Sequence, residues 1–402
     1  MPPLPLVVKP PLRGVLSLSS RVLLLLLLLA ACGDSDSADR PPQSDVVPTS
    51  ASAGDNDPEP SETPTIETGQ PEVDDGPDDQ GPDADGPDQP GFSLENWPST
   101  PVLGTGEPVG VDDSGTPGLS LGRIAVPETS ALMASRTEDG VYWTIQDRAD
   151  GEDRAALLGI RIVDGDLDAT YGDDGLRTVS VNDVANVDWE TLAPGPDGTL
   201  LIGDLGNNDC RRSDQKVLQI QEPGPADPEA DGDGDGDVAN LVARLLVDFP
   251  DTAEVCGGKN AEASISLDGS YILLAKTEPP VLYRLKDPVD GDNLLERLGP
   301  IAQPAGGFDK LVTGMSINDD QTRVVVTTAG ERFWVYETSD DVLESLATTP
   351  PRWSRRYDAT VADTQIEGAA FVPGTDDIVL IGENRSVWSW PSDIYEEGVL
   401  ER

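Results

Sequence analysis

The chain has 402 residues, with 75 Asp and Glu against 27 Lys and Arg, no histidine, and a formal net charge of −48. Such an acidic protein repels nucleic acid and anionic lipid, which argues against either as a partner. The absence of histidine excludes Ser-His-Asp and Cys-His catalysis, histidine metal sites and imidazole pH switches. The composition does not exclude sites for hard cations that prefer oxygen ligands, such as Ca²⁺.

The N-terminus is typical of a secretory signal. Three basic residues precede an unbroken apolar run over 22–31, which is too short to cross a bilayer but suits a signal-peptide core. The run ends in Leu29-Ala30-Ala31-Cys32, which resembles the lipobox of bacterial lipoproteins. In that family the peptide is cut before the cysteine, which then carries a diacylglycerol. The resemblance implies a signal peptide over 1–31, lipidation of Cys32 and an extracytoplasmic protein anchored to the bacterial cell membrane. The alternative is an ordinary signal with an accidental cysteine.

Residues 32–92 predict a disordered linker. After the cysteine the segment holds 17 acidic residues against Arg40 alone, and Asp74–Pro90 repeats a Gly-Pro-Asp unit. This composition buries too little apolar surface to offset the entropy of ordering the chain. We expect a spacer between the membrane anchor and a single domain over 93–402, with an unspecific cation-binding tract as the alternative.

The remaining chain predicts an all-β fold with internal repetition. Short β-rich runs alternate with Gly, Asp, Asn and Pro, and no long stretch has helical periodicity. A polar residue, small residues and a strand recur five times, each followed by an acidic turn and two further strands. The five repeats begin at Glu128, Glu190, Glu262, Thr313 and Glu367.

A repeat of four strands in about 50 residues is typical of a propeller blade. We therefore predict a single β-propeller with five blades, and keep six blades, a β-sandwich and an irregular solenoid as alternatives. The fifth repeat stops short of a fourth strand. A strand near Leu119–Val126 would complete it and close the ring.

Propeller geometry predicts which loops share a face. The chain reverses at each strand, so the segment leading into the first strand and the loop after the second strand of a blade lie on the same side. Polar residues concentrate in these segments, including Asp147, Lys276 and Glu383 in the loops after second strands. The predicted rim consists of Glu128, Asp188, Glu190, Asp204, Asn207, Glu262 and Glu367.

Three interpretations of this rim stay open. Carboxylates and asparagine amides at a channel mouth are the ligands of a Ca²⁺ site. A carboxylate pair would also serve acid/base hydrolysis. Alternatively, the first-strand glutamates hydrogen-bond neighbouring blade backbones and hold the ring together.

The other two cysteines predict a disulfide. With Cys32 assigned to lipid, Cys210 and Cys256 form an even pair in an oxidising compartment, and both fall on the predicted rim face. Two free buried thiols are the alternative. The run Asp231–Asp237 imitates the start of an EF-hand loop, but Val242 stands where a bidentate Glu is required. We interpret it as a flexible acidic insertion on the opposite face.

A family resemblance accompanies these patterns. Asn186–Ala193, Gly203–Asn208 and Asn260–Ala263 resemble motifs of secreted bacterial propellers in the esterase-like and phytase-like group. The resemblance covers roughly residues 120–390 and implies a propeller. Phytase propellers hold several Ca²⁺ ions that bind phosphate, which suits an acidic rim. The basic side chains that phosphate also needs have only a few candidates here, such as Lys276 and Arg148, and no Gly-x-Ser-x-Gly elbow is present.

The sequence therefore favours a membrane-anchored, extracytoplasmic propeller that binds a small ligand or an envelope protein and is stabilised by Ca²⁺. It favours a binding module over an enzyme. The alternative is a Ca²⁺-dependent hydrolase that acts on a phosphoester or glycan through the carboxylate rim, without histidine.

Overall fold

A computed structural model describes residues 93–106, 108, 118–147, 155–225, 237–250, 259–330, 332–356 and 365–396. All of them belong to the compact unit Pro82–Arg402. The predicted signal peptide, the predicted lipidation site Cys32 and the whole acidic linker over 32–92 lie outside these residues, and so does Cys256. These expectations stay predictions.

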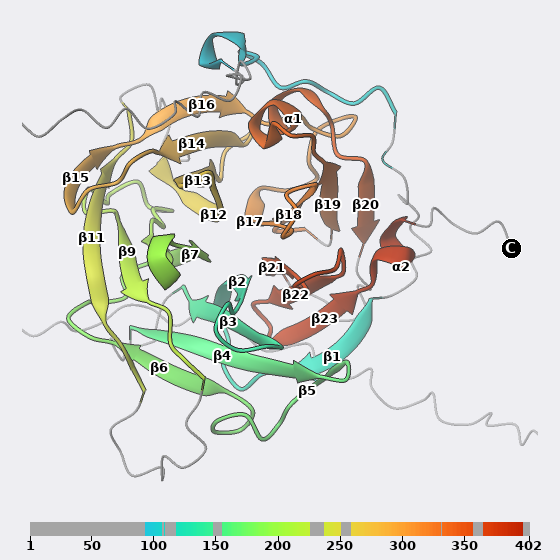
Figure 1. The fold of residues 1–402 in the computed structure, drawn as a ribbon. Helices are drawn as coiled ribbons and strands as arrows, with labels where there is room; N and C mark the ends of the chain where they lie inside the picture. Colours follow the sequence, from blue (N-terminus) through green and yellow to red (C-terminus); the bar gives the residue numbers. More distant parts are fainter. Residues whose placement is uncertain are drawn as a thin grey trace, which may run out of the picture. The chain divides into compact units, whose positions relative to one another are not determined.

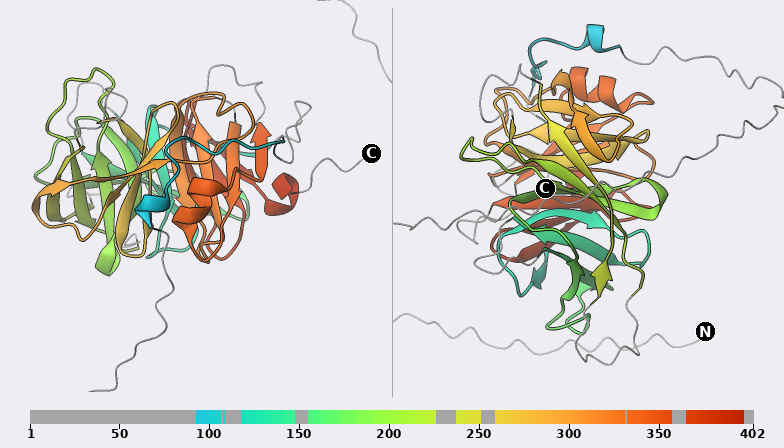
Figure 2. Two further views of the ribbon diagram at one scale, coloured as in Figure 1. Left: turned by 90° about the horizontal axis from the view of Figure 1, so that it is seen from above. Right: turned by 90° about the vertical axis from the view of Figure 1, so that its left-hand side faces the viewer.

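Five small sheets stand around a common axis and form a five-bladed β-propeller, as predicted (Figures 1 and 2). Counted outward from the axis, blade 1 contains β2 (Thr129–Ala134), β3 (Val141–Gln146), β4 (Ala156–Val163) and β6 (Arg177–Val181). Blade 2 contains β7 (Trp189–Pro194), β8 (Thr199–Asp204), β9 (Lys216–Gln221) and β11 (Leu241–Asp248). Blade 3 contains β12 (Ala261–Leu267), β13 (Ser270–Ala275), β14 (Val281–Leu285) and β16 (Glu296–Pro300). Blade 4 contains β17 (Val312–Ile317), β18 (Arg323–Thr328), β19 (Arg332–Glu337) and β20 (Trp353–Arg356). Blade 5 contains β21 (Ile366–Phe371), β22 (Ile378–Gly382) and β23 (Ser386–Trp390) from the end of the chain.

The N-terminal strand closes the ring. β1 (Leu119–Arg123) pairs antiparallel with β23 and becomes the outermost strand of blade 5. This confirms the expectation that a strand near Leu119–Val126 completes the last blade. The inner strands β2 and β21 also pack against each other. Gly368 is required there, because a Cβ on it would lie 2.5 Å from the main-chain carbon of Ala131.

A second device links neighbouring blades at the periphery. In each blade, the element that follows the third strand packs on the outermost strand of the preceding blade, or on the residues directly after it. The five pairs are β5 (Asp166–Leu167) on β1, β10 (Val238–Ala239) on β6, β15 (Gly291–Leu294) on β11, α1 (Val342–Thr348) beside β16, and α2 (Ser392–Glu396) on β20. We refer to these five elements as the peripheral clasps. The sequence did not predict them, because each clasp is short and acts on another blade.

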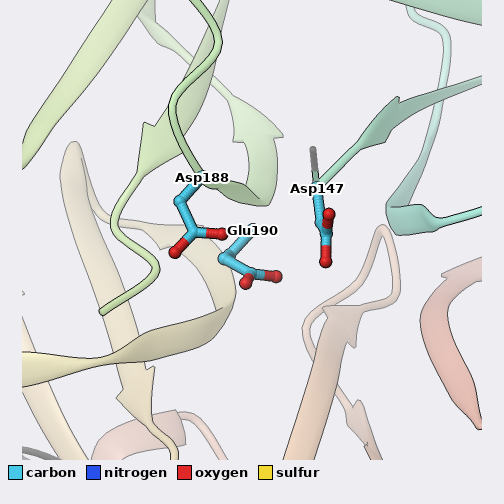
Figure 3. Close-up of side chains that lie close together, drawn as sticks. All are labelled: Asp147, Asp188 and Glu190. Carbon is cyan, nitrogen blue, oxygen red and sulfur yellow. The ribbon is translucent and has the colours of Figure 1, made fainter. Parts of the chain in front are cut away.

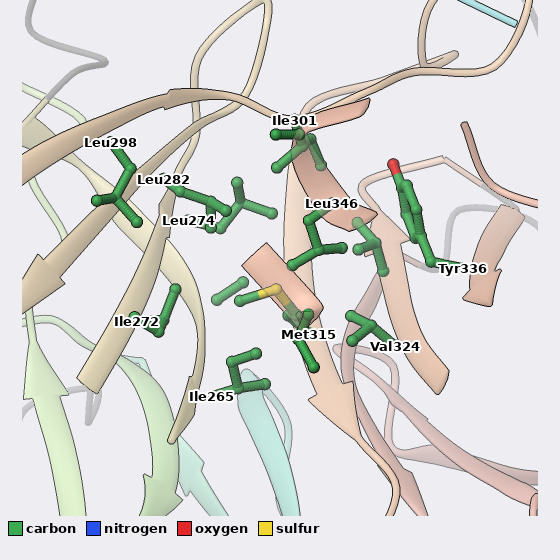
Figure 4. Packing of buried hydrophobic residues seen from close by; sticks show 14 of the residues in the cluster. Ile265, Ile272, Leu274, Leu282, Leu298, Ile301, Met315, Val324, Tyr336 and Leu346 are labelled. Atoms are coloured by element: carbon green, nitrogen blue, oxygen red, sulfur yellow. The ribbon is translucent and has the colours of Figure 1, made fainter. Parts of the chain in front are cut away.

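Apolar layers between the blades form the core. Figure 4 shows the layer between blades 3 and 4, where Ile265 and Ile272 lie near Met315 and Val324. Leu346 of the α1 clasp enters the same layer, and its carbonyl accepts a hydrogen bond from the Ala302 N–H at 2.7 Å. Alternating buried positions on each strand supply these layers, as expected for sheets packed face to face. Two single-turn 3-10 helices, η1 (Leu94–Asn96) and η2 (Pro196–Gly198), complete the described elements.

Candidate cation site at the channel mouth

One main-chain hydrogen bond recurs in all five blades and defines the functional face. The donor is the N–H of a residue one or two positions after the second strand of the blade. The acceptor is a carbonyl in the segment that leads into the first strand of the same blade. The pairs are Asp147 to Glu128, Gly206 to Asp188, Lys276 to Asn260, Ala329 to Leu311 and Glu383 to Gln365, with N···O distances between 2.8 and 3.1 Å. This confirms the prediction that these two segments share a face. We refer to their side of the central channel as the channel mouth.

A β-bulge near the start of the inner strands places the glutamates. The register of the inner pair shifts by one residue at the second position of β7, β12, β17 and β21. The extra residues are Glu190, Glu262, Thr313 and Glu367. A bulge re-aims the extra side chain. Four of the five repeated residues singled out in the sequence, three glutamates and Thr313, therefore stand at equivalent places around the axis.

Three carboxylates gather at the channel mouth between blades 1 and 2. Asp147, Asp188 and Glu190 each place one carboxylate oxygen so that all three atoms lie within 4.8 Å of one another (Figure 3). This spacing fits one Ca²⁺, because two oxygens on opposite sides of the ion, each about 2.4 Å away, stand about 4.8 Å apart. Three protein oxygens supply part of the six to eight ligands that Ca²⁺ takes.

Glu190 is the buried member of this cluster. Its side chain is 4% exposed, and Ser130 donates a hydrogen bond to its Oε2 at 3.1 Å. No described Lys or Arg pairs with it. Burial raises the pKa of Glu190 well above its usual value, and the neighbouring charges of Glu262, Asp188, Asp147 and Glu367 raise it further. Both effects favour a proton or a bound cation on this carboxyl.

Glu262 and Glu367 face the same channel but differ in their partners. Lys276 Nζ lies 2.6 Å from Glu262 Oε2, and Asn260 Nδ2 donates to Glu262 Oε1 at 3.2 Å. Glu367 is 7% exposed and accepts no hydrogen bond from a described residue. Burial, then Glu262 and Glu383, raise the pKa of Glu367 well above its usual value, although Lys276 opposes this.

Asp204 and Asn207 make hydrogen bonds to the segments that carry the acidic residues of the channel mouth. Asp204 is fully buried between Arg212 at 2.7 Å and Lys216 at 2.5 Å, and it accepts the Asp188 N–H at 3.1 Å. Asn207 bridges blades 2 and 3, because its N–H donates to Asn260 Oδ1 at 2.9 Å. These two predicted rim residues position the loops that carry Asp188 and Glu262.

Glu128 stands apart from the buried acids. Its side chain is exposed, and its main chain joins blade 1 to blade 5 through a 3.2 Å hydrogen bond to the Glu383 carbonyl. Of the four repeated glutamates, three therefore turn into the channel. Asp147 replaces Glu128 as the acidic contribution of blade 1.

Hydroxyl groups make hydrogen bonds to neighbouring blade backbones, a role that one interpretation of the rim gave to the glutamates. Ser130 shares its single hydroxyl hydrogen between Glu190 Oε2 and the Glu190 carbonyl at 3.2 Å, Thr129 donates to the Gly382 carbonyl at 3.2 Å, and Thr313 donates to the Ile366 carbonyl at 2.5 Å. Below the mouth, small residues of all five inner strands leave a cavity of about 10 Å³ on the axis, which is room for about one water. A ligand larger than one water does not fit this cavity.

The remaining sequence expectations fall partly outside the described residues. Cys210 lies in the loop after β8, on the predicted face. Because Cys256 is not described, the disulfide stays a prediction. Of the Asp231–Asp237 run only Asp237 is described. It lies between the third and fourth strands of blade 2, as predicted, and pairs with Arg177 of blade 1 at 2.6 Å.

Fold and site together define a five-bladed β-propeller with a carboxylate cluster at one mouth of its channel. No protein-family model and no curated protein matches the chain. Neither α-helix within the described residues is long and apolar enough to span a bilayer.

Proposed function

We propose that this protein is a membrane-anchored extracytoplasmic β-propeller that binds a divalent cation, best matched by Ca²⁺, at Asp147, Asp188 and Glu190. The observation that carries the proposal is the 4.8 Å grouping of three carboxylates, with Glu190 buried and lacking a described cationic partner. The cation would relieve the mutual repulsion of these groups. Its open coordination positions would accept oxygen atoms of a small ligand or of an envelope protein.

A calcium titration followed by thermal unfolding tests this proposal. Micromolar to millimolar Ca²⁺ should raise the unfolding temperature of the full chain in a saturable way, because a ligand bound only to the folded state stabilises it. Glu190→Gln should remove most of the shift. Asp320→Asn, in an exposed turn on the opposite face, is the matched control and should keep it. An equal, non-saturating response of all three proteins would identify general screening and contradict the proposal.

A second candidate function is a Ca²⁺-dependent hydrolase that acts on a phosphoester or glycan. The observation in its favour is that Glu190 and Glu367, two buried carboxyls with raised pKa, face the same mouth, and such groups act as general acids. A panel of phosphoester, acyl-ester and glycan substrates decides it. Turnover that requires Ca²⁺ and disappears in Glu190→Gln supports the hydrolase, whereas no turnover on any substrate supports the binding module.

The proposed location rests on the N-terminal sequence. The run Leu29–Cys32 supports cleavage before Cys32 and attachment of a diacylglycerol, with the acidic segment as a spacer. Intact-mass measurement of the protein extracted from membranes should show the lipid adduct on wild type. Cys32→Ala should abolish the adduct and the membrane association. We also propose a Cys210–Cys256 disulfide, which the same measurement with and without reduction and alkylation detects.

A further inference from the structure

We propose that Lys276 is a resident counter-ion that competes with the divalent cation for the carboxylates of the channel mouth, and so sets the affinity of the site. This inference rests on the proposed cation site and specifies its regulation. Lys276 follows β13 directly, in the loop after the second strand of blade 3. It therefore enters the mouth from a different blade than Asp147, Asp188 and Glu190.

The contacts of Lys276 keep Glu262 out of the cation site. Its ammonium lies 2.6 Å from Glu262 Oε2, while Asn260 holds Glu262 Oε1 at 3.2 Å. Both oxygens of Glu262 are thus engaged. Yet Glu262 occupies the same bulge position in β12 that Glu190 occupies in β7. Without the ammonium, Glu262 is a further carboxylate directed at the channel.

The charge of Lys276 reaches beyond its own ion pair. Burial alone would lower the pKa of Lys276, but Glu262, then Glu367 and Glu190, raise it. Glu367 independently indicates that the mouth holds more carboxylates than Lys276 alone neutralises. It is 7% exposed and has no hydrogen bond or ion pair with a described residue. A buried ionised carboxylate without a partner is costly in free energy. The ionised forms of Glu367 and Glu190 are therefore stabilised by the nearest cation, which is either Lys276 or a bound metal.

The Lys276 side chain is also able to move out of the channel mouth into solvent. Its side chain is 20% exposed, against 2% for that of Glu262, and a lysine ammonium on a flexible stem is readily hydrated. A divalent cation near Glu190 would repel the ammonium and attract Glu262. In the empty site Lys276 offsets part of the carboxylate charge, and in the loaded site it turns toward solvent.

The experiment is calcium titration calorimetry on the full chain in four forms. Lys276→Gln should bind Ca²⁺ about tenfold or more tightly than wild type, because a positive charge is removed beside the ion and Glu262 is released. Lys286→Gln is the control, because it removes the same charge from an exposed residue. Lys286 follows β14, whereas Lys276 lies in the loop before β14, so the two lie at opposite ends of this strand. The Ca²⁺ affinity of Lys286→Gln should equal that of wild type. The double variant Glu262→Gln/Lys276→Gln should fall between wild type and Lys276→Gln, because it loses the repulsion without gaining a carboxylate.

The outcomes separate this inference from the proposed function. If wild type binds Ca²⁺ and Lys276→Gln binds equally or more weakly, the inference is overturned and the cation site stands. If every folded form fails to bind, both fail. Should Lys276→Gln not fold, the double variant is compared with Glu262→Gln instead. Tighter binding by the double variant supports the inference, and equal or weaker binding overturns it.

Discussion

Asp188 keeps its place in the cluster because Gly206 has no side chain. A Cβ on Gly206 would lie 2.2 Å from Asp188 Cγ and 2.3 Å from its Oδ2, closer than nonbonded atoms approach. Gly206 also donates its N–H to the Asp188 carbonyl at 3.1 Å. The glycine in the run Gly203–Asn208 is therefore required by the carboxylate that packs against it.

Gly206→Ala should displace Asp188 and weaken Ca²⁺ binding at least tenfold. We expect a loss of unfolding free energy of about 1–3 kcal/mol, the usual cost of overpacking. Calorimetry measures the affinity and urea unfolding measures the stability. Gly224→Ala is the control, because a Cβ there meets no atom within 4 Å. An unchanged affinity in Gly206→Ala would show that Asp188 does not contribute to the site.

Glu190 should make stability depend on pH with a defined sign. Its folded pKa is raised above the ordinary value of 4.5. Below about pH 4.5 the carboxyl is protonated in both states. As the pH rises from there through the folded pKa, only the unfolded state releases its proton readily, so the folded state loses stability.

In a calcium chelator, Glu190→Gln should therefore gain stability relative to wild type as the pH rises above about 4.5. Saturating Ca²⁺ should reverse the difference, because the ion favours the ionised carboxylate of wild type. Urea unfolding at a series of pH values measures both effects. A difference that does not vary with pH would contradict a buried, proton-binding Glu190.

Among the secondary-structure elements, the α2 clasp shows how one blade holds the next. Tyr395 is fully buried against Trp353 of blade 4, with ring centroids 6.1 Å apart. Its hydroxyl donates to the Asp376 carbonyl at 2.6 Å and accepts from Arg323 at 2.9 Å. A five-residue helix has little stability of its own, so these contacts hold it.

Tyr395→Ala should lower the unfolding free energy by about 3–5 kcal/mol, the cost of emptying a buried aromatic site. Tyr395→Phe keeps the ring and should cost about 1–2 kcal/mol, because two hydrogen-bonding groups lose their partner. Asp393→Ala alters an exposed residue of the same helix and should change stability by less than about 0.5 kcal/mol. Equal losses of unfolding free energy for the three substitutions, measured by urea unfolding, would contradict the stabilising role of Tyr395 in the α2 clasp.

At the scale of the whole molecule, the ring is closed by β1, which precedes blade 1 in the sequence but belongs to blade 5. β1 pairs with β23, and Leu121 and Ile124 are both less than 8% exposed beside blade 1. β1 covers the edge of β23, and the β5 clasp packs on the new outer edge that β1 forms. This closure makes the first and last blades mutually dependent.

A chain that begins at Ile124 should therefore lose at least about 4 kcal/mol of stability, since it forfeits the strand pairing and buried Leu121. We expect it to aggregate through the exposed β23 edge. A chain that begins at Ser93 keeps β1 and should unfold at the same temperature as the longer protein. Thermal unfolding and size-exclusion chromatography test this, and a cooperative, monomeric Ile124 form would contradict the role of β1.

Much of the architecture could be predicted from local sequence. The alternation of short β-rich runs with turn residues predicted an all-β fold, and the spacing of the five repeats predicted five blades correctly. The fourth strand of blade 5 was predicted near Leu119–Val126, whereas the fourth strands of the other blades were not located and the clasps were missed, because each clasp acts on another blade. Arg323, for example, joins β18 to Tyr395 and Glu396, which lie 72 and 73 residues further along the chain.

The candidate site was predicted only in outline. Repetition identified Glu190, Glu262 and Glu367 as equivalent, and the strand alternation placed them on one face with Asp147. It could not show that Glu128 is exposed, that Asp204 pairs with both Arg212 and Lys216, or that Lys276 pairs with Glu262. Those outcomes depend on bulges and on contacts between blades, which the spacing of residues in one blade does not report.

By itself, the sequence determined the class of this protein: an excess of acid, no histidine, and five strand repeats that bury their apolar residues only as a ring. These properties are set by composition and by periodicity along the chain, so local residues suffice to predict them. Only the tertiary structure decided which carboxylates meet and which are neutralised. The energy of a buried charge depends on the groups around it within a few ångströms, and here those groups come from different blades.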